Sequence, residues 1–390
     1  MPRLDLTDLQ AAVAARHARY LAELEQLVNL DCGSYTPLGV NRVADFVTAA
    51  LAELGATLER LSYRPGAGEP ALGDLLVGRF DGSGPRLLLI GHMDTVFPEG
   101  TAAARPFRTD GDRALGPGVS DMKGGLLAGL HAIAALHAAG VRPNLTFVAN
   151  PDEEIGSPFS TPHIRELTTT HDAALVLECA RANGDIVSAR KGIADYVIRL
   201  AGRAAHAGVE PEKGRSAILE AARQVIAMHA LNGRWPSVTV NAGVIEGGSR
   251  PNVVAEACRI ELDLRAASVE EFDLAAAEVS RIVTHPTLEG VTAELRQVAH
   301  HPPMERTPAS ARLAGFAATI ADELGFTVRD AATGGASDAN TTSAAGLPTL
   351  DGLGPIGGDD HSVDEWLDLA SVVPRATLLA GLVARIGEAL

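Results

Sequence analysis

Positive charge is scarce in this sequence of 390 residues. Its basic residues number 33 against 49 acidic ones, and the only lysines are Lys123, Lys191 and Lys213. The formal net charge is therefore -16 at pH 7. Binding to nucleic acid needs clustered Lys and Arg that face phosphates, and no such cluster is present. We therefore expect no nucleic-acid partner.

Cysteines and long apolar runs are also few. Cys32, Cys179 and Cys258 are far apart and odd in number, which favours a reducing compartment over a disulfide scaffold. No window reaches about 18 uninterrupted apolar residues, and the N-terminus has no apolar signal-peptide core. With 46% hydrophobic residues, the composition is that of an ordinary globular protein. These features predict a cytoplasmic protein with no membrane partner.

The length predicts more than one domain. In residues 1–190 and 303–390, strands alternate with helices, which indicates a mostly parallel sheet with helices on both faces. One helix is predicted to begin at Ser120 or Asp121 and to end at Gly140. Residues 191–302 follow the order β-α-β-β-α-β of a ferredoxin-like α+β layer, with a capping box in its second helix from Ser268 to Glu271. We interpret 191–302 as a domain inserted into an α/β domain.

Polar residues stand where the predicted strands end. One such place is "PRLLLIGHMDTVFP", in which a buried strand runs straight into His92 and Asp94. Functional groups gather at the carboxyl ends of parallel strands, so residues far apart in the chain can meet in one crevice. The complete set consists of His92, Asp94, Glu153, Glu154, Glu178 and His361, together with Asp121 after a Gly-Pro-Gly turn.

Imidazole and carboxylate ligands without thiolate suit Zn²⁺, Mn²⁺ or Co²⁺. The set has too many ligands for one four-coordinate ion, and it suits two ions that share a bridging carboxylate. In the pair Glu153-Glu154, one residue can bind metal while the other takes a proton from a metal-bound water. Asp94 is placed to orient the imidazole of His92.

Each of these residues also has an ordinary interpretation. A histidine at a strand end is often structural, paired glutamates often lie in a solvated turn, and Asp121 is a good helix N-cap. Lys123 opposes the helix dipole and is either solvated or compensated by nearby acids or substrate. No G-x-S-x-G, P-loop or G-x-G-x-x-G motif is present, and Cys179 fits a small core residue better than a nucleophile.

Six motifs occur in order over nearly the whole chain: "GHMDTV", "GPGVSDMKGG", "PDEEIGS", "VLECA", "AAHAGVEPEKGRSAI" and "GGDDHSVDE". Together they resemble the dinuclear zinc aminopeptidase/carboxypeptidase and aminoacylase family, and within it the glutamate carboxypeptidases that cleave folates. The resemblance implies a zinc-peptidase catalytic domain and an inserted lid and dimerisation domain. We therefore expect a homodimer.

The resemblance also implies roles for the strand-end residues. Two Zn²⁺ per subunit are expected, with Co²⁺ or Mn²⁺ as alternatives, one held by His92 and Glu178 and the other by Glu154 and His361. Asp121 is expected to bridge the ions, with a cis peptide bond between it and Met122. Glu153 is expected to be the general base and acid, and Asp94 to orient His92.

In the inserted domain, the resemblance implies that His206 reaches the active site of the partner subunit and stabilises the oxyanion. It further implies that the free carboxylate of the substrate is bound by Arg265, Asn252, Gly334 and Gly335. Relatives of this kind carry basic residues that grip a glutamate side chain, where this sequence has Ile186 and His301. The preferred side chain therefore stays open.

The resulting hypothesis is a metal-dependent amidohydrolase or carboxypeptidase that cleaves an amide bond next to a free carboxylate, through a metal-bridged water and Glu153. Its substrate would be a small peptide or an N-acyl amino acid. One alternative is an N-acyl-amino-acid deacylase or dipeptidase of the same family. A remote alternative is a non-catalytic protein that binds an amino acid in the same crevice.

Overall fold

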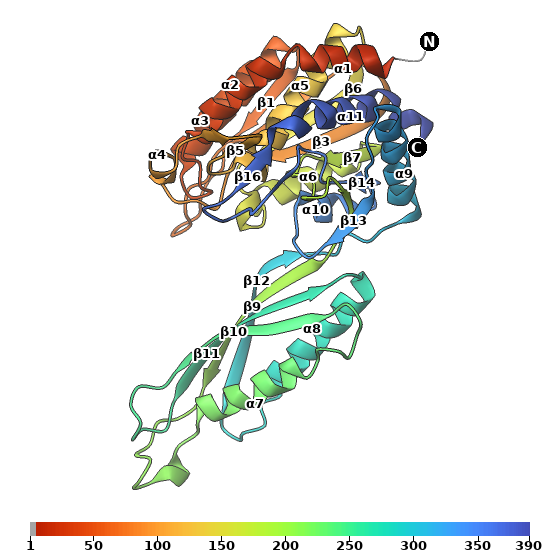
Figure 1. The fold of residues 1–390 in the computed structure, drawn as a ribbon. Coiled ribbons are helices and arrows are strands. Elements are labelled where there is room, and N and C mark those ends of the chain that lie inside the picture. Colours follow the sequence, from red (N-terminus) through yellow and green to blue (C-terminus); the bar gives the residue numbers. More distant parts are fainter. Residues whose placement is uncertain (1–4) are drawn as a thin grey trace. The chain divides into compact units, whose positions relative to one another are not determined.

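The computed structural model describes residues 5–390, and the chain forms two compact units (Figure 1). The larger unit consists of the chain up to Ser188, Arg306–Ala332 and Ser337–Leu390. The smaller unit consists of Ala189–Glu305 and the short segment Thr333–Ala336. This short segment carries Gly334 and Gly335, so both glycines belong to the smaller unit.

A six-stranded sheet forms the centre of the larger unit. Its strand order is β1-β2-β6-β3-β7-β14, and the pairs β6-β3, β3-β7 and β7-β14 are parallel while β1-β2 and β2-β6 are antiparallel. The prediction of a mostly parallel sheet is confirmed. The strands are β1 (Thr57–Leu61), β2 (Leu75–Phe80), β3 (Ser83–His92), β6 (Pro143–Asn150), β7 (Ala173–Val176) and β14 (Thr349–Leu350).

Helices cover this sheet (Figure 1). Helix α5 is apolar on all sides, and its residues from Gly125 to Leu136 are all buried, as expected for a helix enclosed by other elements. It packs against α11 and α1. The helices of this unit include α1 (Leu6–Ala14), α2 (His17–Val28), α3 (Pro37–Glu53), α5 (Gly125–Ala138), α6 (Ser160–Thr168), α9 (Pro308–Glu323), α10 (Asp338–Ala344) and α11 (Val372–Arg385).

The predicted start of α5 at Ser120 or Asp121 is wrong. Val119–Gly124 forms a wide helical turn in which Asp121 and Met122 have non-helical backbone angles, and the regular helix begins at Gly125. The Asp121-Met122 peptide bond is cis, as the resemblance implies. A buried carboxylate, that of Glu365, accepts the backbone N–H groups of this turn, so a tertiary contact sets its geometry instead of the helical ladder.

The stretch Leu369–Glu388, which includes α11, is long and apolar enough to span a membrane by length and composition alone. However, 72% of its most apolar window is buried inside the protein. Helix α11 packs against α5, α1 and α9. This burial is that of a core helix.

The smaller unit is a four-stranded antiparallel sheet of order β10-β11-β9-β12, against which α7 and α8 pack (Figure 1). This is the predicted ferredoxin-like layer. Ser268 caps α8 by accepting the N–H of Glu271, but the Glu271 side chain accepts from Ser237 instead of completing the capping box. The elements are β9 (Gly192–Ala201), α7 (Ala217–His229), β10 (Thr239–Gly247), β11 (Ala257–Ala266), α8 (Val269–Thr284) and β12 (Thr292–His301).

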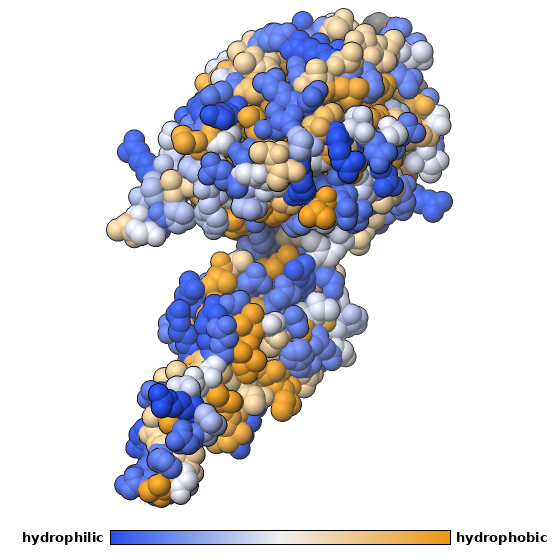
Figure 2. Space-filling model, turned by 60° about the vertical axis from the view of Figure 1, so that its left-hand side comes forward, coloured by the Kyte–Doolittle hydropathy of each residue, from blue (hydrophilic) through white to orange (hydrophobic). Residues whose placement is uncertain are grey.

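Apolar side chains reach the surface of the smaller unit, as Figure 2 shows for one of its faces. Ile218, Leu219 and Ile226 of α7 are exposed, and so is Ile245 of β10, against which α7 packs. Strand β10 is also an edge strand, because within residues 5–390 it pairs only with β11. We call these four side chains the α7–β10 face.

Candidate metal centre

The centre begins where β3 ends. His92 is the last residue of β3 and is 1% exposed. Its Nδ1 is hydrogen-bonded to the backbone carbonyl of Asp94 at 3.0 Å, which leaves Nε2 directed toward Asp121 and Glu178. Nε2 lies 3.0 Å from Asp121 Oδ1 and 3.7 Å from Glu178 Oε1. The ring is therefore oriented as a metal-ligating imidazole usually is, with one nitrogen fixed by the protein and the other free for an ion.

Asp121 lies between the two histidines. Its Oδ1 faces His92 at 3.0 Å, and its Oδ2 faces His361 Nε2 at 3.1 Å. His361 is carried by the loop between β15 (Gly357–Gly358) and β16 (Trp366–Asp368), and its Nε2 is also 3.1 Å from Glu154 Oε2. One carboxylate thus presents an oxygen to each of two imidazoles, which is the geometry that a bridging ligand requires.

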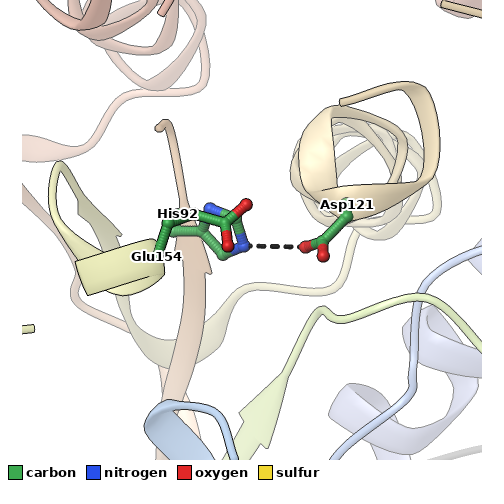
Figure 3. Close-up of side chains that lie close together, drawn as sticks. All are labelled: His92, Asp121 and Glu154. Atoms are coloured by element: carbon green, nitrogen blue, oxygen red, sulfur yellow. Dashed lines mark hydrogen bonds and ion pairs between the residues drawn. The ribbon is translucent and has the colours of Figure 1, made fainter. Parts of the chain in front are cut away.

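Two overlapping groups of side chains could each hold an ion, because their ligand atoms lie within 4.8 Å of one another. One is His92, Asp121 and Glu154, shown in Figure 3, and the other is His92, Glu153 and Glu178. Glu154 Oε1 is buried and has no hydrogen-bond partner among the described residues. A buried oxygen without a partner is costly, and a cation would compensate it. These residues fit a pair of divalent ions.

Asp94 contacts both glutamates and Ser34 as well as His92. Its carboxylate accepts the backbone N–H groups of Glu153 and Glu154 at 3.1 and 3.2 Å, and the hydroxyl of Ser34 at 2.6 Å. It is also 3.4 Å from His92 Nδ1. Asp94 therefore fixes the position of both glutamates relative to β3, a role that the sequence did not reveal.

The centre has an excess of acids, which shifts its pKa values. Burial raises the pKa of Glu154 to about 7, with the charge of Asp121 next in effect. Burial also raises the pKa of Glu153 well above its usual value, and neighbouring Glu178 and Glu154 add to the shift. Hydrogen bonds to Asp121 and Glu154 raise the pKa of His361 to about 11. Crowded carboxylates of this kind attract cations.

Burial lowers the pKa of His92, but Glu178, Asp121 and Asp94 outweigh this effect and raise it well above the usual value. In Asp121 burial raises the pKa, whereas His361 and His92 lower it, and the net shift is strongly downward. Asp121 is therefore an anion at neutral pH.

Glu365 holds the turn that carries Asp121, and sequence reasoning missed it. It is 1% exposed, and its carboxylate accepts the N–H groups of Gly118, Ser120 and Asp121 at 2.9, 2.9 and 3.1 Å. Burial raises its pKa to about 7 although these hydrogen bonds oppose the shift. The sequence feature that could have pointed to Glu365 is its position in "HSVDE", four residues after His361.

His206, the expected oxyanion donor, and Asn252, expected to bind the substrate carboxylate, lie together in the smaller unit. His206 is exposed, and its Nδ1 accepts the N–H of Gly208 at 3.2 Å. The next residue, Ala207, donates its N–H to the carbonyl of exposed Asn252 at 2.9 Å, and His206 pairs with Val253 in an isolated bridge. His206 and Asn252 are therefore on adjacent segments.

The other proposed substrate residues form a second group. Arg265 donates from Nη1 to the Gly334 carbonyl at 2.9 Å and pairs with Asp263 at 3.0 Å. Arg190, which the sequence did not single out, donates to the Gly335 carbonyl at 3.2 Å. Two arginine side chains therefore hold the Gly334–Gly335 segment by hydrogen bonds to its backbone carbonyls.

The remaining predicted positions are placed as follows. Ile186 is fully buried in the core of the larger unit, so it cannot contact a substrate. His301 is half-buried at the end of β12, and burial lowers its pKa. Lys123 is buried, and its Nζ donates to the carbonyls of Leu30 and Pro117 at 3.1 and 3.0 Å. Burial raises the pKa of Cys179 well above its usual value, which disfavours a thiolate nucleophile.

A centre beside a mostly parallel sheet that gathers two histidines and five carboxylates, with one carboxylate between the histidines, is typical of a metal-dependent hydrolase. Residues 88–385 match the family model described as Peptidase family M20/M25/M40. The chain belongs to this family.

Individual relatives agree with this assignment. The chain is 31% identical to carboxypeptidase G2 of Pseudomonas sp. (strain RS-16) over 387 residues, 98% of this chain and 91% of the relative. It is 32% identical to acetylornithine deacetylase of Myxococcus xanthus over 258 residues, 63% of this chain and 66% of the relative. Among solved structures, aminopeptidase PepT from Bacillus cereus ATCC 10987 superimposes with a TM-score of 0.76 at 22% identity, covering 95% of this chain and 98% of the other. At this identity, the similarity to aminopeptidase PepT shows a shared fold alone.

Proposed function

We propose that the protein is a cytoplasmic, zinc-dependent amidohydrolase of the carboxypeptidase type, which cleaves an amide bond next to a free carboxylate. The observation that carries the proposal is the position of Asp121, whose two carboxylate oxygens face His92 and His361 at 3.0 and 3.1 Å. The likeness to carboxypeptidase G2 over nearly the whole chain supports the type of substrate.

We assign His92 and Glu178 to one ion and Glu154 and His361 to the other, with Asp121 as the bridge. Zinc at this site would acidify a water molecule and polarise the scissile carbonyl. Co²⁺ or Mn²⁺ would suit the same donors. This assignment is supported by the burial of His92 and by the hydrogen bonds from the backbone N–H groups of both glutamates to the Asp94 carboxylate.

Glu153 is the proposed general base. Its backbone N–H is fixed by Asp94, and its side chain lies with His92 and Glu178 in the second donor group. There it takes the proton from the attacking water and later gives it to the leaving nitrogen. His206 is proposed to donate a hydrogen bond to the oxyanion, and Arg265, Asn252, Gly334 and Gly335 to bind the free carboxylate of the substrate.

The geometry of the smaller unit supports a homodimer. His206 pairs with Val253, before β11 begins at Ala257, whereas Arg265 lies near the far end of β11. Eight residues of strand between Ala257 and Arg265 span about 27 Å, much more than the roughly 7 Å of an extended dipeptide. One small substrate cannot touch both residues of the same chain. His206 is therefore assigned to the active site of a second copy, and Asn252, which lies on the segment adjacent to His206, is assigned with it.

The α7–β10 face is the surface that we assign to this second copy. Exposed apolar side chains and an unpaired edge strand are features of interaction sites. The exposed fractions of Ile226 and Ile245 are 72% and 52%.

The first test is metal content and hydrolysis. Purified protein should hold about two zinc ions per chain and cleave members of a panel of acyl-Glu, acyl-Ala and acyl-Arg amides, and chelation should abolish cleavage. Cleavage of N-acetyl amino acids or dipeptides without release of C-terminal Glu would favour a deacylase or dipeptidase, which the partial likeness to acetylornithine deacetylase also supports. Undetectable metal together with no cleavage would favour an amino-acid-binding protein.

A further inference from the structure

Two buried carboxylates contact the segment that carries Glu153 and Glu154. The Asp94 carboxylate accepts the backbone N–H groups of both glutamates. The second carboxylate is that of Asp338, the first residue of α10, which is 3% exposed. Asp338 is neither a proposed metal ligand nor the proposed general base. Because burial of a carboxylate is costly unless hydrogen bonds compensate it, the partners of Asp338 indicate what it does.

Asp338 accepts a hydrogen bond at each end of this segment. Its Oδ1 accepts the hydroxyl of Ser157 at 2.7 Å, and its Oδ2 accepts the side-chain amide of Asn150. Asn150 is the last residue of β6 and is fully buried, and Ser157 is 1% exposed. The turn with Glu153 and Glu154 therefore lies between two residues that are bound to one carboxylate.

The backbone of Ser157 is strained. Its φ is 52°, in the left-handed region that residues other than Gly adopt at a cost. Such a conformation persists where surrounding contacts impose it. At Ser157 these contacts include the hydroxyl bond to Asp338 and the backbone N–H, which donates to the Asp152 carbonyl at 2.8 Å. Asp338 thus stabilises a strained backbone close to the two glutamates.

Helix α10 does not use the Asp338 side chain for its own capping. Its N-cap is Ser337, whose hydroxyl accepts the N–H of Ala339 at 3.1 Å. In return, the side chain of Asn340 accepts the N–H of Ser337 at 3.0 Å. The capping box is therefore complete without Asp338, and its carboxylate serves the Glu153 segment instead.

From these contacts we infer that Asp338 is a positioning residue that holds the Glu153 carboxylate in place for the attacking water. This inference rests on the proposed function, in which Glu153 is the general base and Glu154 is a metal ligand. Glu154 would be fixed by the ion that it binds, whereas Glu153 depends on the protein for its position. Displacement of a reacting group by about 1 Å can lower a rate about 100-fold. The loss of Asp338 should therefore act mainly through Glu153.

The test measures kcat and KM at saturating zinc for D338A, D338N and T342V. D338A should lower kcat about 10-fold to 100-fold and change KM less than about threefold, as expected when a group that acts in the transition state is misplaced. D338N should stay within about fivefold of the wild-type kcat, since its oxygen can accept from Asn150 while its NH₂ group donates to the Ser157 hydroxyl.

T342V is the matched control on the same helix. Thr342 is fully buried, and its hydroxyl accepts that of Thr349 in β14 at 3.0 Å. Loss of this hydrogen bond should lower the free energy of unfolding without lowering kcat. A kcat that falls as far in T342V as in D338A would show that Asp338 has only a structural role.

A second pair of variants tests the same contact at Ser157. S157A removes the hydroxyl and keeps the strained backbone, whereas S157G removes the hydroxyl and also relieves the strain, because Gly adopts positive φ freely. S157A should therefore lower kcat about tenfold or more, and S157G should lower it less. A wild-type kcat in S157A would contradict the inference, even if D338A failed to fold.

Hydrogen exchange gives a measurement that does not depend on turnover. In D338A the backbone amides of residues 150–157 should exchange faster than in the wild type, and T342V should leave their rates unchanged. A wild-type kcat in D338A, or a loss confined to KM, would overturn the positioning role while the hydrolase proposal stands. If the wild type cleaves no substrate, the proposed function fails, and unchanged exchange in D338A would then refute the hold on this segment separately.

Discussion

The buried carboxylate of Glu365 accepts the backbone N–H of Asp121 at 3.1 Å, and the same oxygen accepts the N–H of Ser120 at 2.9 Å. Asp121 is the residue whose two oxygens face His92 and His361. Glu365 therefore acts on the centre without facing either histidine, because it fixes the turn from which Asp121 projects. Groups that orient metal ligands in this way commonly change metal affinity about 10-fold to 100-fold when they are replaced.

The first prediction concerns E365Q. The amide presents one oxygen and one NH₂ group to three N–H donors, so at least one donor loses its acceptor and the turn at Asp121 shifts. Zinc affinity, measured by competition with a chromogenic chelator, should weaken about 10-fold to 100-fold. D364N changes the same charge at the neighbouring exposed position and should bind zinc like the wild type. Equal affinities in the two variants would refute a positioning role for Glu365.

The second prediction concerns metal removal and stability. Without cations the carboxylates of Asp121, Glu153, Glu154 and Glu178 repel one another in a buried site, so chelation should lower the thermal midpoint. With zinc at a thousand times its Kd, binding contributes about 4 kcal/mol, which corresponds to roughly 10 °C for a unit of this size. Scanning calorimetry with chelator, then with added zinc, measures the shift. D121N should show a much smaller shift, and an equal shift in D121N would place the binding elsewhere.

The third prediction concerns the exchange of His206 between subunits. H206A and E153Q should each lose activity by a factor of about 100 or more. In a co-refolded mixture, each mixed dimer has one site with intact Glu153 and the partner's His206, so about a quarter of wild-type activity should return. The control is wild type mixed with the double variant H206A/E153Q, whose mixed dimers should be inactive. Mixed dimers that are half active in the control would show that His206 serves its own chain.

Much of the fold could be predicted because its signals are local. The apolar run before His92 and the all-apolar α5 can only be buried, and alternation in the middle of the chain fixes the strands of the smaller unit. The predicted start of α5 is wrong because Asp121 and Met122 have non-helical backbone angles, in a turn whose N–H groups donate to Glu365, more than 240 residues away. A tertiary contact of this kind leaves no local pattern around Asp121.

In the candidate site too, some residues have a local sequence signal and others become visible only in the folded structure. Residue type and position after predicted strands or a glycine turn single out His92, Asp121 and Glu154 in the sequence, and the structure brings these three side chains together. Ser34 was missed because a serine in a loop has no distinctive signal, and only folding shows that its hydroxyl donates to Asp94 at 2.6 Å. Ile186 was considered as a specificity position, yet its burial in the core became visible only in three dimensions.

The last prediction concerns the pH dependence of stability and a histidine away from the metal centre. His131 of α5 is 3% exposed, and its Nε2 is 2.7 Å from Glu23. Burial lowers the pKa of His131, although Glu23 opposes the shift. Above pH about 6.5 the ring is neutral in folded and unfolded chains alike. Below that pH the unfolded chain binds a proton that the folded chain does not, so the free energy of unfolding falls as the pH drops toward the folded pKa.

H131Q keeps a hydrogen-bond donor near Glu23 but cannot titrate, so its stability should decline less steeply than that of the wild type between pH about 7 and about 5.5. The decline should not vanish, because burial also lowers the pKa of His137, His171 and His301. Urea unfolding at several pH values, on metal-free protein so that zinc loss does not contribute, gives the two slopes. If H131Q declined as steeply as the wild type, the buried ring of His131 would contribute nothing to the acid sensitivity of the fold.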